Sequence, residues 1–223
     1  MHRISKCLFT TIYKFKKVLM KKIISISFIV MMLLSLSACA NHQSDTAAAR
    51  AHKTSTSKNI KKHTASQMRN LTGDYWLLSS EVINYPDLTK FTNLFIETSI
   101  SKNRTYLKSN NEVLYTFYSS AGINHTTPTG TYAIQPETSP TFYNANEGEG
   151  ANYAVSWLDH GIYLFHSVPI DASGNYMTTE AEKLGKQPSS HGCVRLSVAD
   201  SHWLYQQANL GLLPVGTPVI ISP

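Results

Sequence analysis

The chain has 223 residues, with 20 Lys or Arg against 14 Asp or Glu, which gives a formal net charge of +6. Residues 1–39 hold seven basic residues and no acid, and residues 40–70 hold six basic residues and one acid. Residues 71–223, long enough to bury a core, hold seven basic residues and thirteen acids. An acidic domain argues against a nucleic-acid-binding role, and we expect no nucleic-acid partner.

The first 39 residues have the pattern of an export signal. Lys21 and Lys22 precede an apolar run of about 15 residues, which is short for a membrane span. The stretch Leu36-Ser-Ala-Cys39 resembles the lipobox of bacterial lipoproteins, a family in which the cysteine is acylated. We therefore expect a signal peptide over 1–39, lipidation of Cys39 and an extracytoplasmic protein anchored to the outer face of the membrane. Plain secretion is the alternative.

Residues 40–70 are predicted to form a flexible linker. They are rich in Ala, Ser, Thr, Lys, His and Gln and contain almost no large apolar side chain. Such a segment cannot bury enough apolar surface to offset the entropy lost on ordering.

The predicted domain, residues 71–223, reads as a series of short strands. Runs rich in β-formers are found at 93–99, 104–108, 112–119, 131–134, 153–157, 161–166 and 217–222. Ser197 and Asp200 favour the start of one helix, which Gly211 can close. We therefore expect a mainly β domain, a sandwich or a barrel-like sheet, with one or two short helices. The polar, glycine-containing stretch 136–152 is either a mobile flap over a groove or a surface loop.

Cys193 needs an explanation, because it is the one cysteine of the domain and so has no internal disulfide partner there. It follows Ser190, His191 and Gly192 in the sequence Ser-Ser-His-Gly-Cys-Val-Arg-Leu (189–196). A thiol acts as a nucleophile when a base or a positive charge assists its deprotonation. His166, at the end of an apolar strand, is a candidate base.

These motifs resemble the L,D-transpeptidase catalytic domain (YkuD) family, in its bacterial lipoprotein form. The resemblance is carried by 190–196 and by Tyr-Leu-Phe-His-Ser (163–167), with supporting matches at 127–132 and 216–220. It spans roughly residues 94–222. Two departures are a longer segment between the two main motifs, residues 169–188, and Arg195 where the family often has Asn.

The resemblance implies a role for each residue of the two motifs. Cys193 would be the nucleophile, His166 its base, and Ser167 the group that orients the imidazole through its hydroxyl or its carbonyl. Backbone N–H groups near Gly192 and Cys193 would stabilise the oxyanion. Ser190 and His191 would shape the substrate-binding loop, and Arg195 would support the site or hold a substrate carboxylate.

The implied function is cross-linking of peptidoglycan stem peptides through a cysteine thioester, without a metal or an organic cofactor, by a protein we expect to be a monomer. If water replaces the acceptor amine, the same site is an L,D-carboxypeptidase. A non-catalytic wall-binding lipoprotein and a sortase-like enzyme are further alternatives. A zinc site built from His160, His166, His191 and Cys193 is another, although their spacing is not typical of structural zinc.

Overall fold

The computed structural model describes residues 67–223, so the predicted signal peptide, Cys39 and the linker up to residue 66 lie outside the described residues. Residues 67–70, which we assigned to the linker, take part in the folded region. The Arg69 N–H donates to the Ser80 carbonyl, and the Val82 N–H donates to the Gln67 carbonyl, both at 2.8 Å. The linker prediction was therefore wrong for these four residues. No helix in the described part of the chain is both long and apolar enough to span a bilayer.

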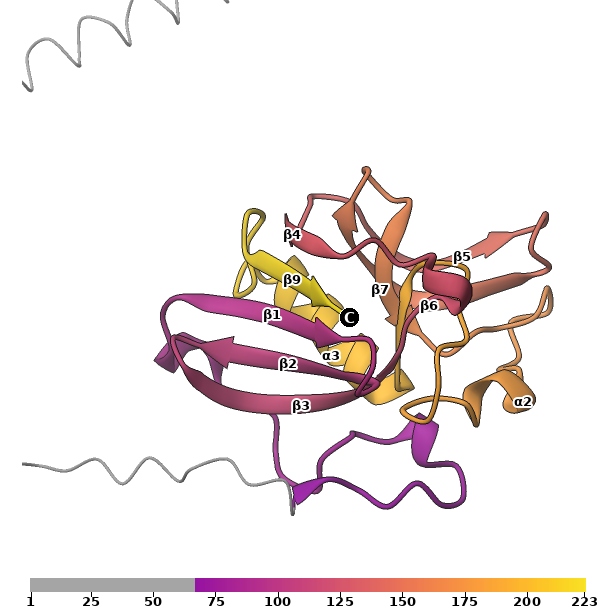
Figure 1. Ribbon diagram of the computed structural model, residues 1–223, viewed down its shortest axis with the longest axis horizontal. Helices are drawn as coiled ribbons and strands as arrows, with labels where there is room; N and C mark the ends of the chain where they lie inside the picture. Colours follow the sequence, from indigo (N-terminus) through magenta and orange to yellow (C-terminus); the bar gives the residue numbers. More distant parts are fainter. Residues whose placement is uncertain (1–66) are drawn as a thin grey trace, which may run out of the picture. The chain divides into compact units, whose positions relative to one another are not determined.

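One half of the sheet is built on an antiparallel meander (Figure 1). Its strands are β1 (Leu94–Ser99), β2 (Arg104–Ser109) and β3 (Glu112–Ser120). The C-terminal strand β9 (Pro218–Ser222) adds parallel to β1, and β4 (Gly130–Ala133) adds antiparallel to β9. These strands lie close to the ranges predicted from the runs of β-formers.

The other half carries the two sequence motifs. It consists of β5 (Thr138–Asn144), β6 (Glu149–Leu158), β7 (Tyr163–Ser167) and β8 (Val194–Leu196). β8 pairs parallel with β7 and antiparallel with the end of β3, so it joins the two halves in the strand order β4-β9-β1-β2-β3-β8-β7-β6-β5. The short strand that follows Cys193 is therefore central to the sheet.

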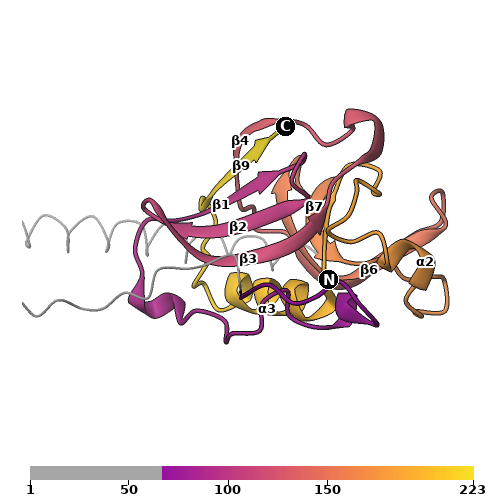
Figure 2. The same ribbon diagram turned by 60° about the horizontal axis from the view of Figure 1, so that its bottom comes forward.

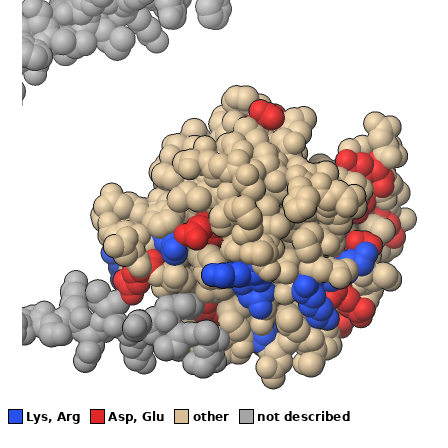
Figure 3. Space-filling view, viewed as in Figure 1, with Lys and Arg blue, Asp and Glu red and all other residues tan. Residues whose placement is uncertain are grey.

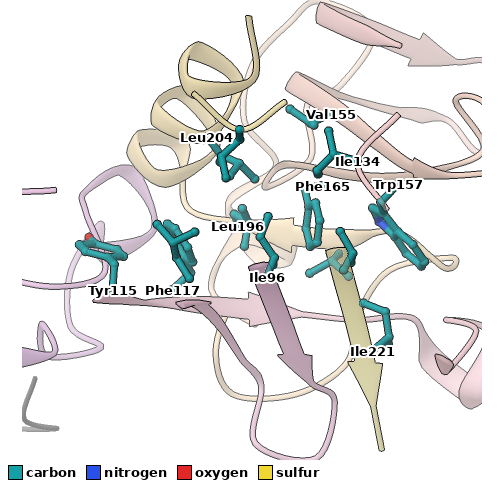
Figure 4. Close-up of a cluster of buried hydrophobic side chains, with 14 of the residues drawn as sticks. Ile96, Tyr115, Phe117, Ile134, Val155, Trp157, Phe165, Leu196, Leu204 and Ile221 are labelled. Carbon is teal, nitrogen blue, oxygen red and sulfur yellow. The ribbon is translucent and has the colours of Figure 1, made fainter. Parts of the chain in front are cut away.

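Both halves contribute side chains to one apolar core (Figure 4). Ile96 and Phe117 come from the meander, whereas Trp157 and Phe165 come from β6 and β7, and all four are at most 1% exposed. Helix α3 (Val198–Asn209) packs against β6 and β7 and adds Leu204 (Figure 2). A sheet whose two halves share one core must curl, and the predicted mainly β, barrel-like class is confirmed.

The long segment between β7 and β8 forms a separate small layer. It contains the short helix α2 (Thr178–Ala181), and Ala181 and Leu184 pack in a second apolar cluster with Tyr75 and Trp76 of the N-terminal segment. Single 3₁₀ turns occur at Tyr75–Leu77, Leu88–Lys90 and Ile123–His125.

Helix α3 begins as predicted, because the Ser197 hydroxyl accepts a hydrogen bond from the Asp200 N–H at 3.1 Å. The stretch 136–152 differs from the prediction of a flap or loop. Most of it is paired in the β5–β6 hairpin, from Thr138 opposite Val155 to Asn144 opposite Glu149.

On the face drawn in Figure 3, basic and acidic side chains both occur, with several of the basic ones in a band along its lower part.

Candidate active site

His166 lies on β7, with its side chain on the opposite face from core residue Phe165, and is 5% exposed. Its Nδ1 lies 2.7 Å from the Ser167 carbonyl oxygen. A carbonyl can only accept, so Nδ1 carries the hydrogen and Nε2 keeps the lone pair that a base needs. The Phe142 ring meets the imidazole edge-on at 5.6 Å between centroids. The ring is therefore held in one orientation and one tautomer.

The Ser167 hydroxyl has other partners. It donates to the Val168 carbonyl at 2.7 Å and accepts from the Asn152 N–H at 2.9 Å. Of the two ways in which Ser167 was expected to orient the histidine, the contact seen is the one through its main-chain carbonyl.

The loop that carries Cys193 is fixed by backbone hydrogen bonds. The N–H groups of Ser189 and Ser190 both donate to the Ala121 carbonyl, at 2.8 and 3.0 Å. The Ser190 hydroxyl donates to the Cys193 carbonyl at 2.5 Å and accepts from the Gly192 N–H at 3.1 Å. The Ser190 hydroxyl therefore bridges two backbone groups of the loop. The Gly192 N–H, one of the two proposed oxyanion donors, already has this hydroxyl as its acceptor.

Gly192 is required by its surroundings as well as by its backbone. Its φ is +152°, and a Cβ there would lie 3.0 Å from the Tyr163 ring and 3.3 Å from the Thr126 carbonyl oxygen. Its own carbonyl accepts from the Thr127 hydroxyl at 2.7 Å. The close approach of Tyr163 places the loop directly against β7, the strand of His166.

Cys193 is half-buried, and its Sγ lies 3.5 Å from the Ile162 carbonyl oxygen. Burial raises the pKa of the thiol to about 11, against smaller opposing effects that include a hydrogen bond with the Leu164 backbone. Burial, reinforced by the positive charge of Arg195, lowers the pKa of His166 to about 4. At neutral pH the site therefore holds a neutral thiol and a neutral imidazole.

Cys193 and His166 line one cavity of about 550 Å³. The β5–β6 hairpin supplies one wall, including Phe142, Glu147 and Glu149, so part of the stretch 136–152 borders this cavity. His191 also lines it, with Nδ1 at 3.2 Å from Glu149 Oε1 and 3.5 Å from Glu147 Oε2.

Arg195 is buried rather than available to a substrate. Its side chain is 2% exposed, and its Nη2 bonds both carboxylate oxygens of Glu149, at 2.6 and 2.8 Å. Nη1 donates to Glu180 at 3.1 Å and to Ser189 Oγ at 3.3 Å. The geometry argues against the expectation that Arg195 holds a substrate carboxylate, because two protein carboxylates already pair with the guanidinium. The expectation that Arg195 supports the site stays a prediction. Neither Glu149 nor Glu180 lies in a sequence motif that would have identified it as a partner of Arg195.

The four residues of the zinc hypothesis do not form one ligand cluster. Within residues 67–223, the group whose ligand atoms all lie within 4.8 Å of one another consists of Glu147, Glu149 and His191. His160 lies instead in an exposed turn with a φ of +49°, where its Nδ1 pairs with Glu137 at 2.9 Å.

Comparison with known proteins relates the whole domain to one enzyme family. The family model described as YkuD, L,D-transpeptidase catalytic domain, matches residues 93–221. YciB of Bacillus subtilis (strain 168), a protein provisionally named as an L,D-transpeptidase, is 35% identical over 207 residues, covering 91% of this chain and 100% of YciB.

The chain is also similar, at lower identity, to solved structures. An L,D-transpeptidase from Mycobacterium smegmatis is 22% identical, with a TM-score of 0.46 and 59% of each chain covered. One from Mycobacterium tuberculosis H37Rv is also 22% identical, with a TM-score of 0.46, covering 59% of this chain and 58% of that one. The match thus spans less than two thirds of either solved chain.

Proposed function

Because the chain belongs to the YkuD family of L,D-transpeptidase catalytic domains, we propose that it is a peptidoglycan L,D-transpeptidase whose nucleophile is Cys193. The observation that carries this proposal is the shared cavity, into which the half-buried thiol and an imidazole of fixed tautomer both open. A nucleophile, a base and a group that orients the base are the parts that acyl transfer requires.

The first step forms a thioester. His166 Nε2 takes the thiol proton as Cys193 Sγ attacks the carbonyl of the third residue of a stem tetrapeptide. Because the two pKa values, about 11 and about 4, favour the neutral pair, proton transfer accompanies attack rather than preceding it. The Cys193 N–H is the candidate oxyanion donor, and His166 then protonates the departing amine of the terminal D-Ala.

The second step forms the cross-link. The amine of a neighbouring stem attacks the thioester carbonyl, His166 takes the amine proton, and the sulfur leaves and is reprotonated. Water in place of the amine would release a tripeptide, which is the carboxypeptidase alternative. Burial of His166, together with the cavity wall that the hairpin forms, supports the amine over water by limiting the solvent that reaches the base.

We also propose export and anchoring through acylated Cys39, which would place the domain at the cell wall outside the cytoplasm. The support is the sequence pattern of residues 21–39. A Cys39→Ser variant that still fractionates with membranes would contradict the anchor without affecting the proposal for the domain.

The chemical proposal is tested by trapping the thioester. The purified protein and its Cys193→Ala variant are each mixed with a disaccharide-tetrapeptide and denatured rapidly in acid, and intact masses are measured. A tripeptide adduct on the parent protein alone, with release of D-Ala, is the expected result. D-Ala release by Cys193→Ala would contradict it.

A further inference from the structure

A chain of polar contacts between ionisable side chains runs from the end of α2 to His191 in the cavity lining. Successive members contact each other at 2.6, 3.1, 2.6 and 3.2 Å between side-chain nitrogen and oxygen atoms. In order, the members are Lys183, Glu180, Arg195, Glu149 and His191.

The centre of this chain is sheltered from solvent. The side chain of Arg195 is 2% exposed, against 15% for Glu149 and 24% for Glu180. Charge-assisted hydrogen bonds in such a place are stronger and more directional than surface ion pairs, and a guanidinium offers its donors in a rigid planar fork. The position of Arg195 is therefore set by its two carboxylates.

The same guanidinium joins four segments of the chain. Arg195 belongs to β8, two residues after Cys193, and pairs directly opposite His166 of β7. Glu149 opens β6 in the cavity wall, whereas Glu180 lies on α2 in the long segment between the two motifs. The fourth segment is the loop before Cys193, held through Ser189.

We propose that Glu149 and Glu180 are positioning residues, which hold β8, and with it the Cys193 sulfur, in register with His166 and the cavity wall through Arg195. This inference rests on the proposed function, because it assigns a role in the reaction at that site. We call Arg195 with its two carboxylate partners, Glu149 and Glu180, the clamp. The proposal also assigns a role to the segment 169–188, because its helix α2 supplies Glu180.

Glu180 is the residue on which to test the proposal. Glu149 lines the cavity, so its loss also changes the surface that a substrate meets, whereas Glu180 does not line the cavity. An effect of Glu180→Gln on catalysis therefore cannot come from a changed cavity lining, and Arg195 is the partner of Glu180 that lies in the strand after Cys193. The variant leaves Arg195 paired with Glu149, so the buried guanidinium keeps a carboxylate partner.

The experiment compares Glu180→Gln with Glu182→Gln, an exposed neighbour on the same segment with no side-chain contact to Arg195. Because sub-ångström misplacement of a nucleophile is costly, we expect kcat for thioester formation to fall about 10-fold in Glu180→Gln, with donor KM within about 2-fold. Glu182→Gln should keep parent values. Arg195→Lys should lose more, and adding Glu180→Gln to it should cost nothing further.

Two outcomes would overturn the proposal. One is a Glu180→Gln protein with a lower unfolding midpoint but the parent kcat, which would make the contact merely structural. The other is full additivity of Glu180→Gln and Arg195→Lys.

A second readout separates this proposal from the proposed function, because it needs no turnover. The rate of Cys193 alkylation by iodoacetamide at fixed pH should differ from the parent in Glu180→Gln and not in Glu182→Gln. If the parent makes no thioester, the proposed function fails, and equal alkylation rates for all three proteins would then reject the clamp as well.

Discussion

The Nδ1 hydrogen of His166 is donated to the carbonyl of Ser167, its own neighbour in β7, at 2.7 Å. A backbone group thus performs the orienting task that a carboxylate performs in many catalytic triads. A neutral carbonyl stabilises an imidazolium less than a carboxylate does. This agrees with a histidine whose pKa lies low, at about 4.

Replacing Ser167 by Ala should leave catalysis nearly intact, because the carbonyl that orients His166 remains. The hydroxyl bonds main-chain groups of Val168 and Asn152 and also meets the Tyr176 side chain, so its loss should cost about 1 kcal/mol of unfolding free energy. Urea unfolding and kcat/KM for thioester formation measure the two effects. His166→Gln is the control that should abolish turnover; a comparable loss in Ser167→Ala would assign the hydroxyl a direct role.

The rate of Cys193 alkylation should increase steadily with pH. With a thiol pKa of about 11, the thiolate fraction, and hence the rate, should rise about tenfold per pH unit between pH 8 and pH 10. Iodoacetamide labelling followed by intact mass measures it. A rate that is already constant above pH 7 would instead indicate a preformed thiolate–imidazolium pair.

The buried His166 should make folding stability depend on pH in the acid range. An unfolded histidine titrates near 6.5, whereas the folded one titrates at about 4, so between these values the unfolded state binds more protons. Stability should therefore be complete above pH 6.5 and fall by up to roughly 3 kcal/mol as the pH drops through 4. Urea unfolding at pH 7 and pH 4.5 measures the loss.

His166→Gln is the matched control for that experiment, because it keeps the other titrating groups. Its stability should decline less between the two pH values. An equal decline would show that groups other than His166 cause the acid sensitivity.

Gly192→Ala should impair both the fold and the reaction. The added methyl meets the Tyr163 ring at 3.0 Å in a backbone conformation that favours glycine, so the Cys193 loop must shift. Gly174→Ala is the control, since Gly174 also has a positive φ, +83°, but nothing lies within 4 Å of its added Cβ. Gly174→Ala should cost about 1 kcal/mol of stability and no activity, whereas Gly192→Ala should lose activity as well. Equal kcat in the two variants would contradict this.

Family resemblance leads us to expect that carbapenem-type β-lactams acylate Cys193. Intact mass should rise by the mass of one inhibitor molecule in the parent protein and not in Cys193→Ala. An unmodified parent protein after prolonged exposure would contradict the prediction.

The sequence was sufficient for the parts of the fold with local patterns. Runs of β-formers located β1, β2, β3, β7 and β9, and the cap at Ser197 located α3. β8 was missed because three residues are too few to show a period of two. β5 was missed because it is polar and contains Pro140. Both features are tolerated there because β5 is an edge strand of the sheet.

In the candidate site, too, the residues in local motifs could be predicted and the long-range contacts could not. Cys193, His166 and Ser167 lie in short motifs, and the family predicted from those motifs is confirmed by the match over residues 93–221. The partners of Arg195 could not be predicted, because Glu149 and Glu180 are 46 and 15 residues away and meet it only in the folded sheet. Without them, the sequence left open whether Arg195 supports the site or holds a substrate carboxylate.

The central claim is that Cys193 forms peptidoglycan cross-links, and a product assay tests it most directly. The purified protein and Cys193→Ala are incubated with disaccharide-tetrapeptides, and the products are identified by mass spectrometry. The account predicts dimers that lack one terminal D-Ala, formed by the parent protein alone. Dimers formed equally by Cys193→Ala, or tripeptides as the sole product of the parent protein, would contradict it.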